Sequence, residues 1–194
     1  DPKGEILVTV GVSEAFDLLF RSILEPGDEV VLQDPCFVSY GPIVHLAGGV
    51  PVYVPTTADD GWRLRPEAIE RAIGPRTRAI LLNYPANPTG GTLSRADLLA
   101  IGEIARAHDL LVVSDEIYER LSYGAEHVVF PGLPGMKERT IYLNGFSKAY
   151  AMTGWRVGYA CGPAEILAAM CKIHQYSMMC GPIMGQVAAI EALK

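Results

Sequence analysis

Lys148 and Arg156 are the side chains whose type and spacing first suggest chemistry in this sequence. Lys148 follows a β-type run at 140–143 through a turn of small residues, and Arg156 precedes a second β-type run at 157–161. A lysine at the carboxyl end of a buried strand lies where α/β folds bind their ligands. Low-dielectric surroundings lower the pKa of an amine and make it a competent Schiff-base nucleophile. Arginine keeps its charge and can bind a phosphate group bidentately.

An amine that binds an aldehyde and a nearby cation that binds a phosphate together suggest the cofactor pyridoxal 5'-phosphate (PLP). For an isolated Ser-Lys pair, a solvated lysine after a strand and an arginine that extends its charge into water are the better explanation. The other elements of the chain decide between these interpretations, because they determine what else reaches the same edge of the fold.

The composition predicts a folded domain without a nucleic-acid or membrane partner. The 194 residues suffice for one domain with a sizeable core, and 49% of them are hydrophobic, which argues against disorder. The net charge of -6 offers no basic surface to nucleic acid, and we find neither a signal-peptide pattern nor an apolar run long enough to span a bilayer. The four cysteines form no C-x-x-C pair, so we expect no metal site and reduced thiols in a cytoplasmic protein.

Alternating strand and helix patterns predict an α/β fold. Unbroken apolar runs at 79–82 and 110–113 indicate strands that are buried on both faces. Helical patterns lie between most of the β-type segments, as βαβ units require, and Ser94 with Asp97 approximates a capping box for one of these helices. The predicted strands cover residues 5–10, 29–33, 50–54, 79–83, 110–114, 140–144 and 157–161.

Polar side chains at the ends of two predicted strands are candidates for a cofactor site. Asp115 ends the strand at 110–114, where a buried carboxylate needs a partner such as a protonated pyridine nitrogen. Tyr118 lies three residues later and can face the same side of a helical turn. Asn87 lies in a proline-rich turn and can donate its amide to a ring oxygen. The simpler alternatives are a solvent-facing or helix-capping carboxylate and a turn asparagine that bonds its own backbone.

Two earlier junctions add weaker candidates. Gly11 and Ser13 join a strand to a helix, and such a turn offers backbone N–H groups and a positive dipole end to a phosphate. Ser13 is also the expected N-cap of that helix, which would explain it without any ligand. Phe37 lies just past a strand end and can stack on a flat ring, although an aromatic residue there is more often part of the core.

At this point the sequence resembles the class I and II aminotransferases of the PLP fold type I superfamily, and among them the prokaryotic aspartate and aromatic aminotransferases. The resemblance runs from end to end of the chain. Motifs in the order and spacing of that family carry it: Asn87-Pro-Thr-Gly90, Ser114-Asp-Glu-Ile-Tyr118, Phe146-Ser-Lys148 and Met152-Thr-Gly-Trp-Arg-Val-Gly158.

The resemblance implies a fold and a set of catalytic residues. The fold would be the three-layer α/β/α large domain, covering residues 1–194, with a mostly parallel seven-stranded sheet whose last strand is antiparallel. Lys148 would form the Schiff base with PLP and then move a proton during catalysis. Asp115 would keep the pyridine nitrogen protonated, so that the ring acts as an electron sink, and Tyr118 would stabilise the ring oxygen.

The resemblance also implies how the chain would hold the cofactor. Asn87 would bond the phenolic oxygen together with Tyr118, and Phe37 would stack on the ring. Val12 and Ser13 would form the phosphate-binding turn, beside Arg156 as a phosphate ligand.

One position departs from the family pattern. Relatives often carry a serine or threonine that binds the phosphate three residues before the lysine, and this chain has Gly145 there. Ser147 or a backbone N–H group would have to take its place.

The implied activity is transfer of an amino group from an L-amino acid to a 2-oxo acid in amino acid metabolism and biosynthesis. Family members are homodimers about twice this length, and their N-terminal segment, small domain and partner subunit complete the site. The chain begins at Asp1 and ends at Lys194 inside a helical pattern, so we expect a large-domain fragment that is inactive alone. A PLP-dependent C–S β-lyase and a non-catalytic PLP-binding sensor domain of a regulator are the alternatives.

Overall fold

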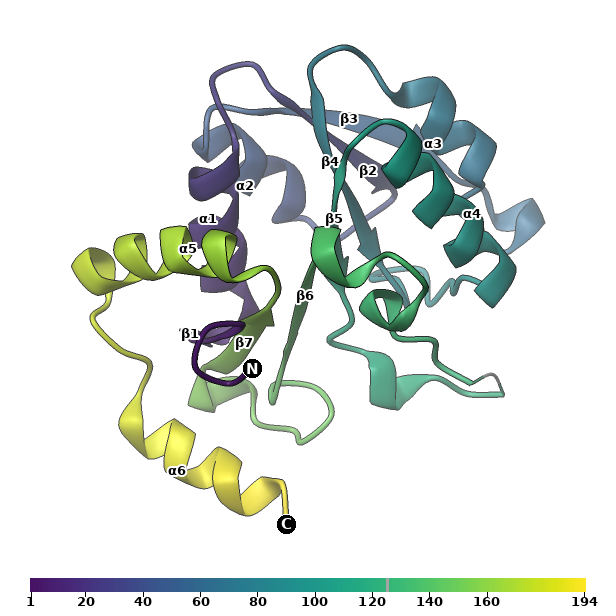
Figure 1. The fold of residues 1–194 in the computed structure, drawn as a ribbon. Coiled ribbons are helices and arrows are strands. Elements are labelled where there is room, and N and C mark those ends of the chain that lie inside the picture. Colours follow the sequence, from purple (N-terminus) through teal and green to yellow (C-terminus); the bar gives the residue numbers. More distant parts are fainter. Residues whose placement is uncertain (125) are drawn as a thin grey trace.

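The computed structural model describes residues 1–124 and 126–194 and shows a twisted sheet with helices against both faces (Figure 1). The strands are β1 (Ile6–Val10), β2 (Glu29–Asp34), β3 (Val50–Pro55), β4 (Thr77–Asn83), β5 (Leu111–Asp115), β6 (Thr140–Gly145) and β7 (Val157–Cys161). The α-helices are α1 (Gly11–Ile23), α2 (Tyr40–Leu46), α3 (Pro66–Ala72), α4 (Arg95–Ala107), α5 (Ala164–Ser177) and α6 (Ile183–Ala192).

The sheet has the order β1-β7-β6-β5-β4-β2-β3. β7 runs antiparallel to both of its neighbours, whereas the pairs among β2, β3, β4, β5 and β6 are parallel. All predicted strands are confirmed within two residues at each end, and so is the antiparallel direction of the last strand.

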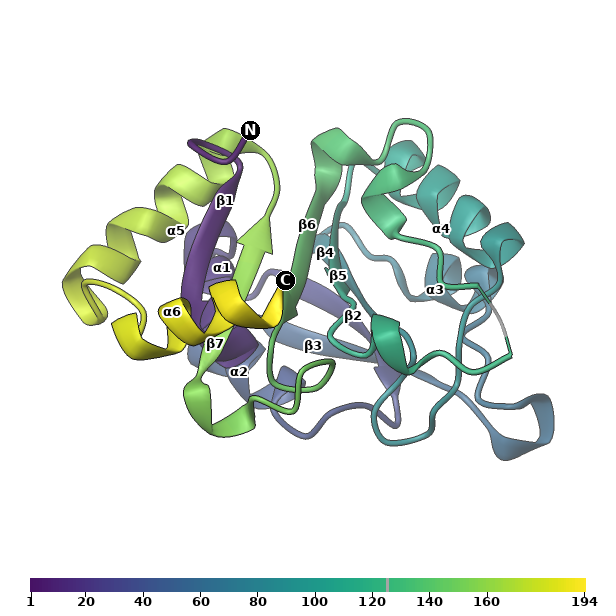
Figure 2. The ribbon, with the colours of Figure 1, turned by 90° about the horizontal axis from the view of Figure 1, so that it is seen from below.

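Alternate residues of each central strand enter two separate cores, which produces three layers. In β4, Ala79 and Leu81 pack with α1, α2 and α5 on one face, while Ile80 and Leu82 pack with α3 and α4 on the other. Strands buried on both faces read as unbroken apolar runs, as this sequence predicted. Figures 1 and 2 show α5 and α4 on opposite sides of the sheet, and the predicted α/β/α architecture is confirmed.

The first residues of α1 contradict one prediction from the sequence, and the first residues of α4 confirm another. Ser13 is not an N-cap: α1 begins directly after β1 at Gly11, whose φ is +69°, and the Val10 N–H donates to the Glu14 carboxylate at 2.5 Å. Glycine adopts such a φ without strain, so the helix begins three residues earlier than a serine cap at position 13 would place it. The capping box of Ser94 at the start of α4 is present.

Three further features of the fold concern α6, the cysteines and the lengths of the helices. α6 is a regular helix, in agreement with the helical pattern at the end of the sequence, and it lies beside β7 with Ala189 packed against Phe146, Met152 and Val157 (Figure 2). All four cysteines are free thiols. Within the described residues, no helix is both long and apolar enough to cross a membrane.

Gly158 provides a test of the packing between β7 and α1. A Cβ atom on Gly158 would lie 2.5 Å from the Val12 nitrogen, whereas one on Gly154 would meet nothing within 4 Å. We expect Gly158→Ala to lower the free energy of unfolding by about 2 kcal/mol, because overpacking displaces backbone. The control Gly154→Ala should change it by less than about 0.5 kcal/mol. Urea unfolding measures both, and equal midpoints for the two variants would contradict the close approach.

Candidate functional site

One pocket collects the side chains that the sequence singled out. Its lining includes the predicted residues Val12, Ser13, Phe37, Asn87, Asp115, Tyr118, Lys148 and Arg156. The remaining lining residues are Phe16, Tyr40, Ile43, Ile117, Ser147 and Thr153.

The topology explains why residues so far apart in sequence meet. The carboxyl ends of parallel strands share one edge of a sheet, so the segments that follow β1, β2, β4, β5 and β6 converge there. β7 runs the opposite way, so its beginning lies at the same edge. Arg156, directly before β7, therefore reaches the pocket although it precedes a strand.

Asp115 is a buried carboxyl that the chain holds with two donors. The Tyr40 hydroxyl donates to Oδ2 at 2.6 Å, and the Ile117 N–H donates to Oδ1 at 3.2 Å. Burial raises the pKa of Asp115 to about 6, although the Tyr40 hydrogen bond opposes that rise. Tyr40 is itself buried, and burial together with the Asp115 charge raises the pKa of its hydroxyl. The pocket thus contains a carboxyl that is poised to take a cationic or protonated partner.

A second set of hydrogen bonds orients the residues beside Asp115. The Asn87 amide donates to the Tyr118 hydroxyl at 3.2 Å, so it is not occupied with its own backbone as the simpler alternative required. Asn83 connects the two elements, since its Oδ1 accepts from the Asn87 N–H at 2.8 Å and its amide donates to the Asp115 carbonyl at 3.0 Å. Asn87 and Tyr118 therefore offer two polar groups to one ligand atom.

The pocket lining also contains a cation beside the start of α1. Arg156 has a left-handed backbone, with φ 54°, and donates from Nη1 to the Thr153 carbonyl at 2.7 Å. A Cβ atom on Gly11 would collide with the Arg156 guanidinium, so the charge lies against the start of α1. An arginine at a helix N-terminus forms a ready anion site, because the guanidinium and the free N–H groups act together.

Lys148 differs from the sequence prediction in one respect. Its side chain is exposed, and its Nζ lies 5.7 Å from the centre of the Tyr118 ring. The low-dielectric surroundings that the sequence argument expected are therefore absent in this chain. The cause is local, because the turn that carries Lys148 runs along the open rim of the pocket, where residues 151 and 153–155 are exposed as well.

The packing explains the glycine at 145. A Cβ atom on Gly145 would lie 2.8 Å from the Val157 carbonyl oxygen and 2.9 Å from the Gly158 Cα. A serine or threonine at this position would have to displace β7. Ser147 lines the pocket two residues later.

Sequence reasoning missed Tyr40 as a site residue. It was assigned only to the start of a short helix, yet it supplies the shortest hydrogen bond to Asp115. Its spacing of three residues from Phe37, at the carboxyl end of β2, is the feature that would have revealed it. The two rings pack edge to face with centres 5.5 Å apart, so both lie at the same wall. Phe16, Ile43, Ile117 and Thr153 carry no comparable sequence feature.

Chemically, the pocket combines three capacities. Its lining holds an anion site at the start of α1, a buried carboxyl that can take a protonated partner, and an amine. A ligand that carries both a phosphate and a ring nitrogen would use the first two groups.

Comparison with known proteins shows the family. The family described as "Aminotransferase class I and II" matches residues 1–194, and the chain belongs to it. Members of this family depend on PLP in general. The chain is 51% identical over 193 residues to the putative aminotransferase YugH of Bacillus subtilis (strain 168), and 46% identical over 191 residues to an aspartate aminotransferase of Geobacillus stearothermophilus.

Solved structures agree with this assignment. The chain matches an aromatic aminotransferase from Pyrococcus horikoshii OT3 with a TM-score of 0.97 at 45% identity, over 100% of this chain and 52% of that one. It matches a Thermus thermophilus aspartate aminotransferase with a TM-score of 0.95 at 45% identity, over 98% of this chain and 50% of that one. Both curated relatives named above are matched over 97% or more of this chain, and the chain spans about half their length.

The Asp115 pocket predicts a defined response to pH. Because the folded-state pKa is raised to about 6, the stability contributed by protonated Asp115 is fully present below its ordinary value of 3.8 and is lost as the pH rises through 6. Tyr40→Phe removes a donor to the charged form, so the pKa should rise further, by about one pH unit. Carbon-13 NMR titration of the Asp115 carboxyl measures this, with the exposed Tyr176→Phe as control. A fall in the pKa in Tyr40→Phe would contradict the assigned role.

Proposed function

We propose that this chain is the PLP-binding part of an aminotransferase that moves an amino group from an L-amino acid to a 2-oxo acid. The observation that carries the proposal is the convergence of Asp115, Lys148 and Arg156 on the lining of one pocket. Membership of the aminotransferase family supports it.

The residues present fit the cofactor. Gly11 and Gly158 keep the start of α1 open and bring the Arg156 guanidinium against it, since a side chain at either glycine would fill that space. The Asp115 carboxyl, the only one among the described residues of the pocket lining, accepts hydrogen bonds from Tyr40 and Ile117 and can accept more. When bound, PLP would supply an electron sink for the substrate's α-carbon electrons.

Each residue has a separate task in this proposal. Asp115 holds a proton on the ring nitrogen, and Tyr118 with Asn87 donates to the ring oxygen. Lys148 would hold the cofactor's aldehyde through Nζ, and its amine, when free, would accept and return a proton. Phe37 stacks on the ring, where its edge-to-face contact with Tyr40 supports it.

The phosphate end uses backbone and side chains together. The N–H groups of Val12 and Ser13 lie in the first turn of α1, and Arg156 supplies the charge. Ser147 takes the role of the hydroxyl that Gly145 cannot provide, which its place in the pocket lining supports.

We propose further that residues 1–194 form the large domain of a longer cytoplasmic protein of amino acid biosynthesis, whose other parts bind the substrate's α-carboxylate. The chain spans about half the length of its relatives, which supports its assignment to a longer protein. A relative named as a probable N-acetyl-LL-diaminopimelate aminotransferase of Bacillus subtilis, 42% identical, supports a biosynthetic role.

Borohydride trapping tests the cofactor site. We expect reduction of the chain with added PLP to fix the label on the Lys148 peptide, because that amine lines the pocket that also holds Asp115 and Arg156. Lys148→Ala should abolish this adduct, and the exposed Lys172→Ala should leave it unchanged. Peptide mass mapping is the measurement. Labelling spread over surface lysines, in this chain and in the longer protein, would rule out the proposed site.

Product analysis then tests the reaction in the longer protein. An aminotransferase exchanges a 2-oxo acid with the amino donor, whereas a C–S β-lyase releases ammonia and pyruvate. Binding of PLP without either product would favour the sensor domain. We expect exchange in the wild type, and loss of at least about a thousandfold in kcat in Lys148→Ala, because both covalent and proton-transfer roles disappear.

We also propose a second copy of the chain as the partner, on the outer face of α6. The exposed fractions of Ile183, Met184, Val187, Ile190 and Leu193 lie between 61% and 72%, which is high for large apolar side chains on one helix. Gln186 and Glu191 are the polar side chains of that helix, so its other exposed side chains are apolar and their contact with water is unfavourable.

A substitution that places a charge on the outer face of α6 tests the proposed self-association. Val187→Asp should weaken self-association by about tenfold or more, since a carboxylate would be buried at the interface. Leu46→Asp, on the exposed side of α2, is the matched control and should leave association unchanged. Sedimentation of this chain and of the longer protein gives the dissociation constants. Equal constants for wild type and Val187→Asp would refute the α6 interface.

A further inference from the structure

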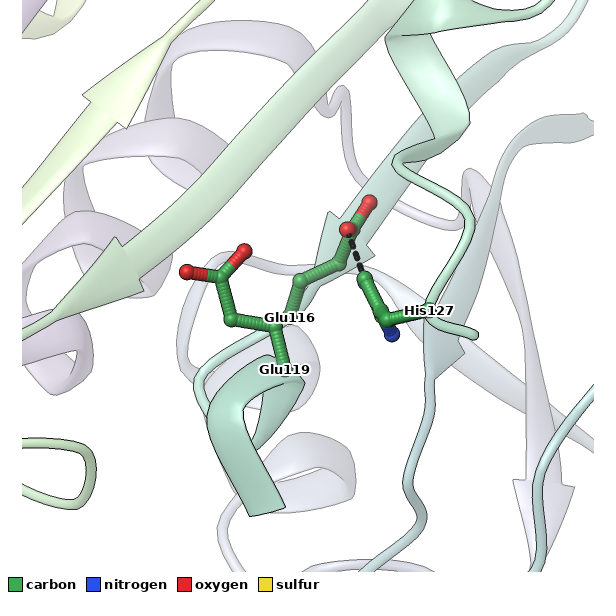
Figure 3. Close-up of side chains that lie close together, drawn as sticks. All are labelled: Glu116, Glu119 and His127. Atoms are coloured by element: carbon green, nitrogen blue, oxygen red, sulfur yellow. Dashed lines mark hydrogen bonds and ion pairs between the residues drawn. The ribbon is translucent and has the colours of Figure 1, made fainter. Parts of the chain in front are cut away.

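A buried hydrogen-bond network lies next to the pocket, around Glu116. This residue is fully buried, and its Oε2 atom is 2.5 Å from Nε2 of His127, a residue that is only 10% exposed. Figure 3 shows the two side chains directed toward each other, with Glu119 beside them. None of these three residues belongs to the pocket lining.

Glu116 joins three separate parts of the chain. Its Oε1 atom accepts from Tyr84 at the end of β4 at 3.0 Å, from Ser114 within β5 at 2.7 Å, and from the Phe130 N–H at 3.0 Å. The bond from His127 fills Oε2. A buried carboxylate with its oxygens fully occupied fixes its neighbours strongly, because any lost partner leaves a charge without solvation.

Consecutive residues at the ends of β4 and β5 contact the pocket and the network in alternation. Side chains alternate along a strand, so consecutive residues face opposite sides. At the end of β4, Asn83 bonds the pocket residue Asp115, whereas the next residue, Tyr84, bonds Glu116. At the end of β5, Asp115 lines the pocket, whereas the next residue, Glu116, is the centre of the network. The same short backbone segments are therefore held from both sides.

His127 joins this network from the segment that follows Glu116 by 11 residues. Its ring stacks on Tyr84 with centres 5.1 Å apart, and among the described residues its buried Nδ1 atom has no hydrogen-bond partner. The Val128 carbonyl oxygen lies 3.2 Å from the same Tyr84 hydroxyl, whose single proton it shares with Glu116, so two successive residues contact Tyr84. The His127 ring joins the network through Nε2 and Glu116.

A cation is a poorer explanation of the same residues. Glu116, Glu119 and His127 do bring ligand atoms within 4.8 Å of one another. Each of those side chains already has a partner, however: His127 binds Glu116 directly, and Glu119 Oε2 accepts from the Tyr142 hydroxyl at 3.0 Å. A metal would have to break the short bond between His127 and Glu116 before it could enter.

We propose that the Glu116–His127 pair is a positioning device for the cofactor-facing residues Asp115 and Tyr118. This inference rests on the proposed function for the identity of the ligand. The pair holds residue 116 between the two: Asp115 precedes it, and the Glu119 N–H donates to the Glu116 carbonyl at 2.9 Å, which closes the turn that carries Tyr118. When the pair is lost, the turn relaxes and the two side chains lose their common orientation toward the ring.

The test compares His127→Leu, which removes the donor, with His127→Gln, which keeps an amide donor for Glu116. The exposed His45→Leu is the matched control. One readout is hydrogen exchange of the cofactor-free protein at the amides of residues 117, 119 and 121, with strand amides of Ile80 and Val112 as internal references. The other is the dissociation constant for PLP and the absorbance of the bound cofactor as a function of pH.

In His127→Leu we expect exchange at 117–121 to rise about tenfold while the strand references stay constant, since only the local turn is released. The dissociation constant for PLP should rise roughly tenfold, and the pH dependence of the absorbance should shift, because misplaced contacts weaken binding. His127→Gln should recover most of both effects, and His45→Leu should show neither.

Several results would overturn the proposal. If exchange rose equally at residues 117–121 and at the strand reference amides, His127 would contribute to global stability and not to local positioning. Unchanged exchange in His127→Leu would deny any positioning role, whether or not the protein binds PLP. If wild-type protein failed to bind PLP while exchange responded as expected, the proposed function would fail and the local device would stand. Tightening of PLP binding by Zn²⁺ in wild type but not in His127→Gln would assign the cluster to a cation instead.

Discussion

Two adjacent buried carboxyls at the end of β5 impose the strongest constraint on this structure. Asp115 and Glu116 are 4% and 0% exposed, and each would be costly without hydrogen-bond donors. They point to opposite sides of the sheet, so each requires its own set of donors. Tyr40 and Ile117 supply one set, while Tyr84, Ser114, Phe130 and His127 supply the other. Much of the chain around the site is arranged to meet these two demands.

The two sets differ in a way that separates function from structure. Glu116 has both oxygens occupied, by four donors, and its place is closed to solvent. Asp115 has two donors for a carboxylate that can accept more, and its pKa is raised to about 6. A carboxyl that is desolvated but incompletely bonded is a reactive or ligand-binding group, whereas a saturated one is a structural group. The end of β5 thus provides a binding group and its anchor in consecutive residues.

The sequence revealed the strand ends well and the connections between them poorly. Apolar runs predicted the buried strands because burial on both faces leaves an unmistakable pattern, and polar residues at their carboxyl ends indicated Asp115 and Asn87. Tyr40 was missed because its partner lies 75 residues away, and no local pattern encodes that contact. Ser13 was misread as a cap because the positive φ of Gly11 depends on the approach of Arg156 and β7, which are also distant in sequence.

The exposure of Lys148 and the apolar face of α6 have a common structural basis. The turn around Lys148 places Phe146 and Met152 against Ala189 of α6, and a Cβ atom on Gly185 would lie 2.7 Å from the Trp155 carbonyl oxygen. α6 therefore backs the turn that carries both the amine and Arg156. The packing of α6 thus fixes the position of the turn from one side, while the other side of the turn forms the open rim of the pocket.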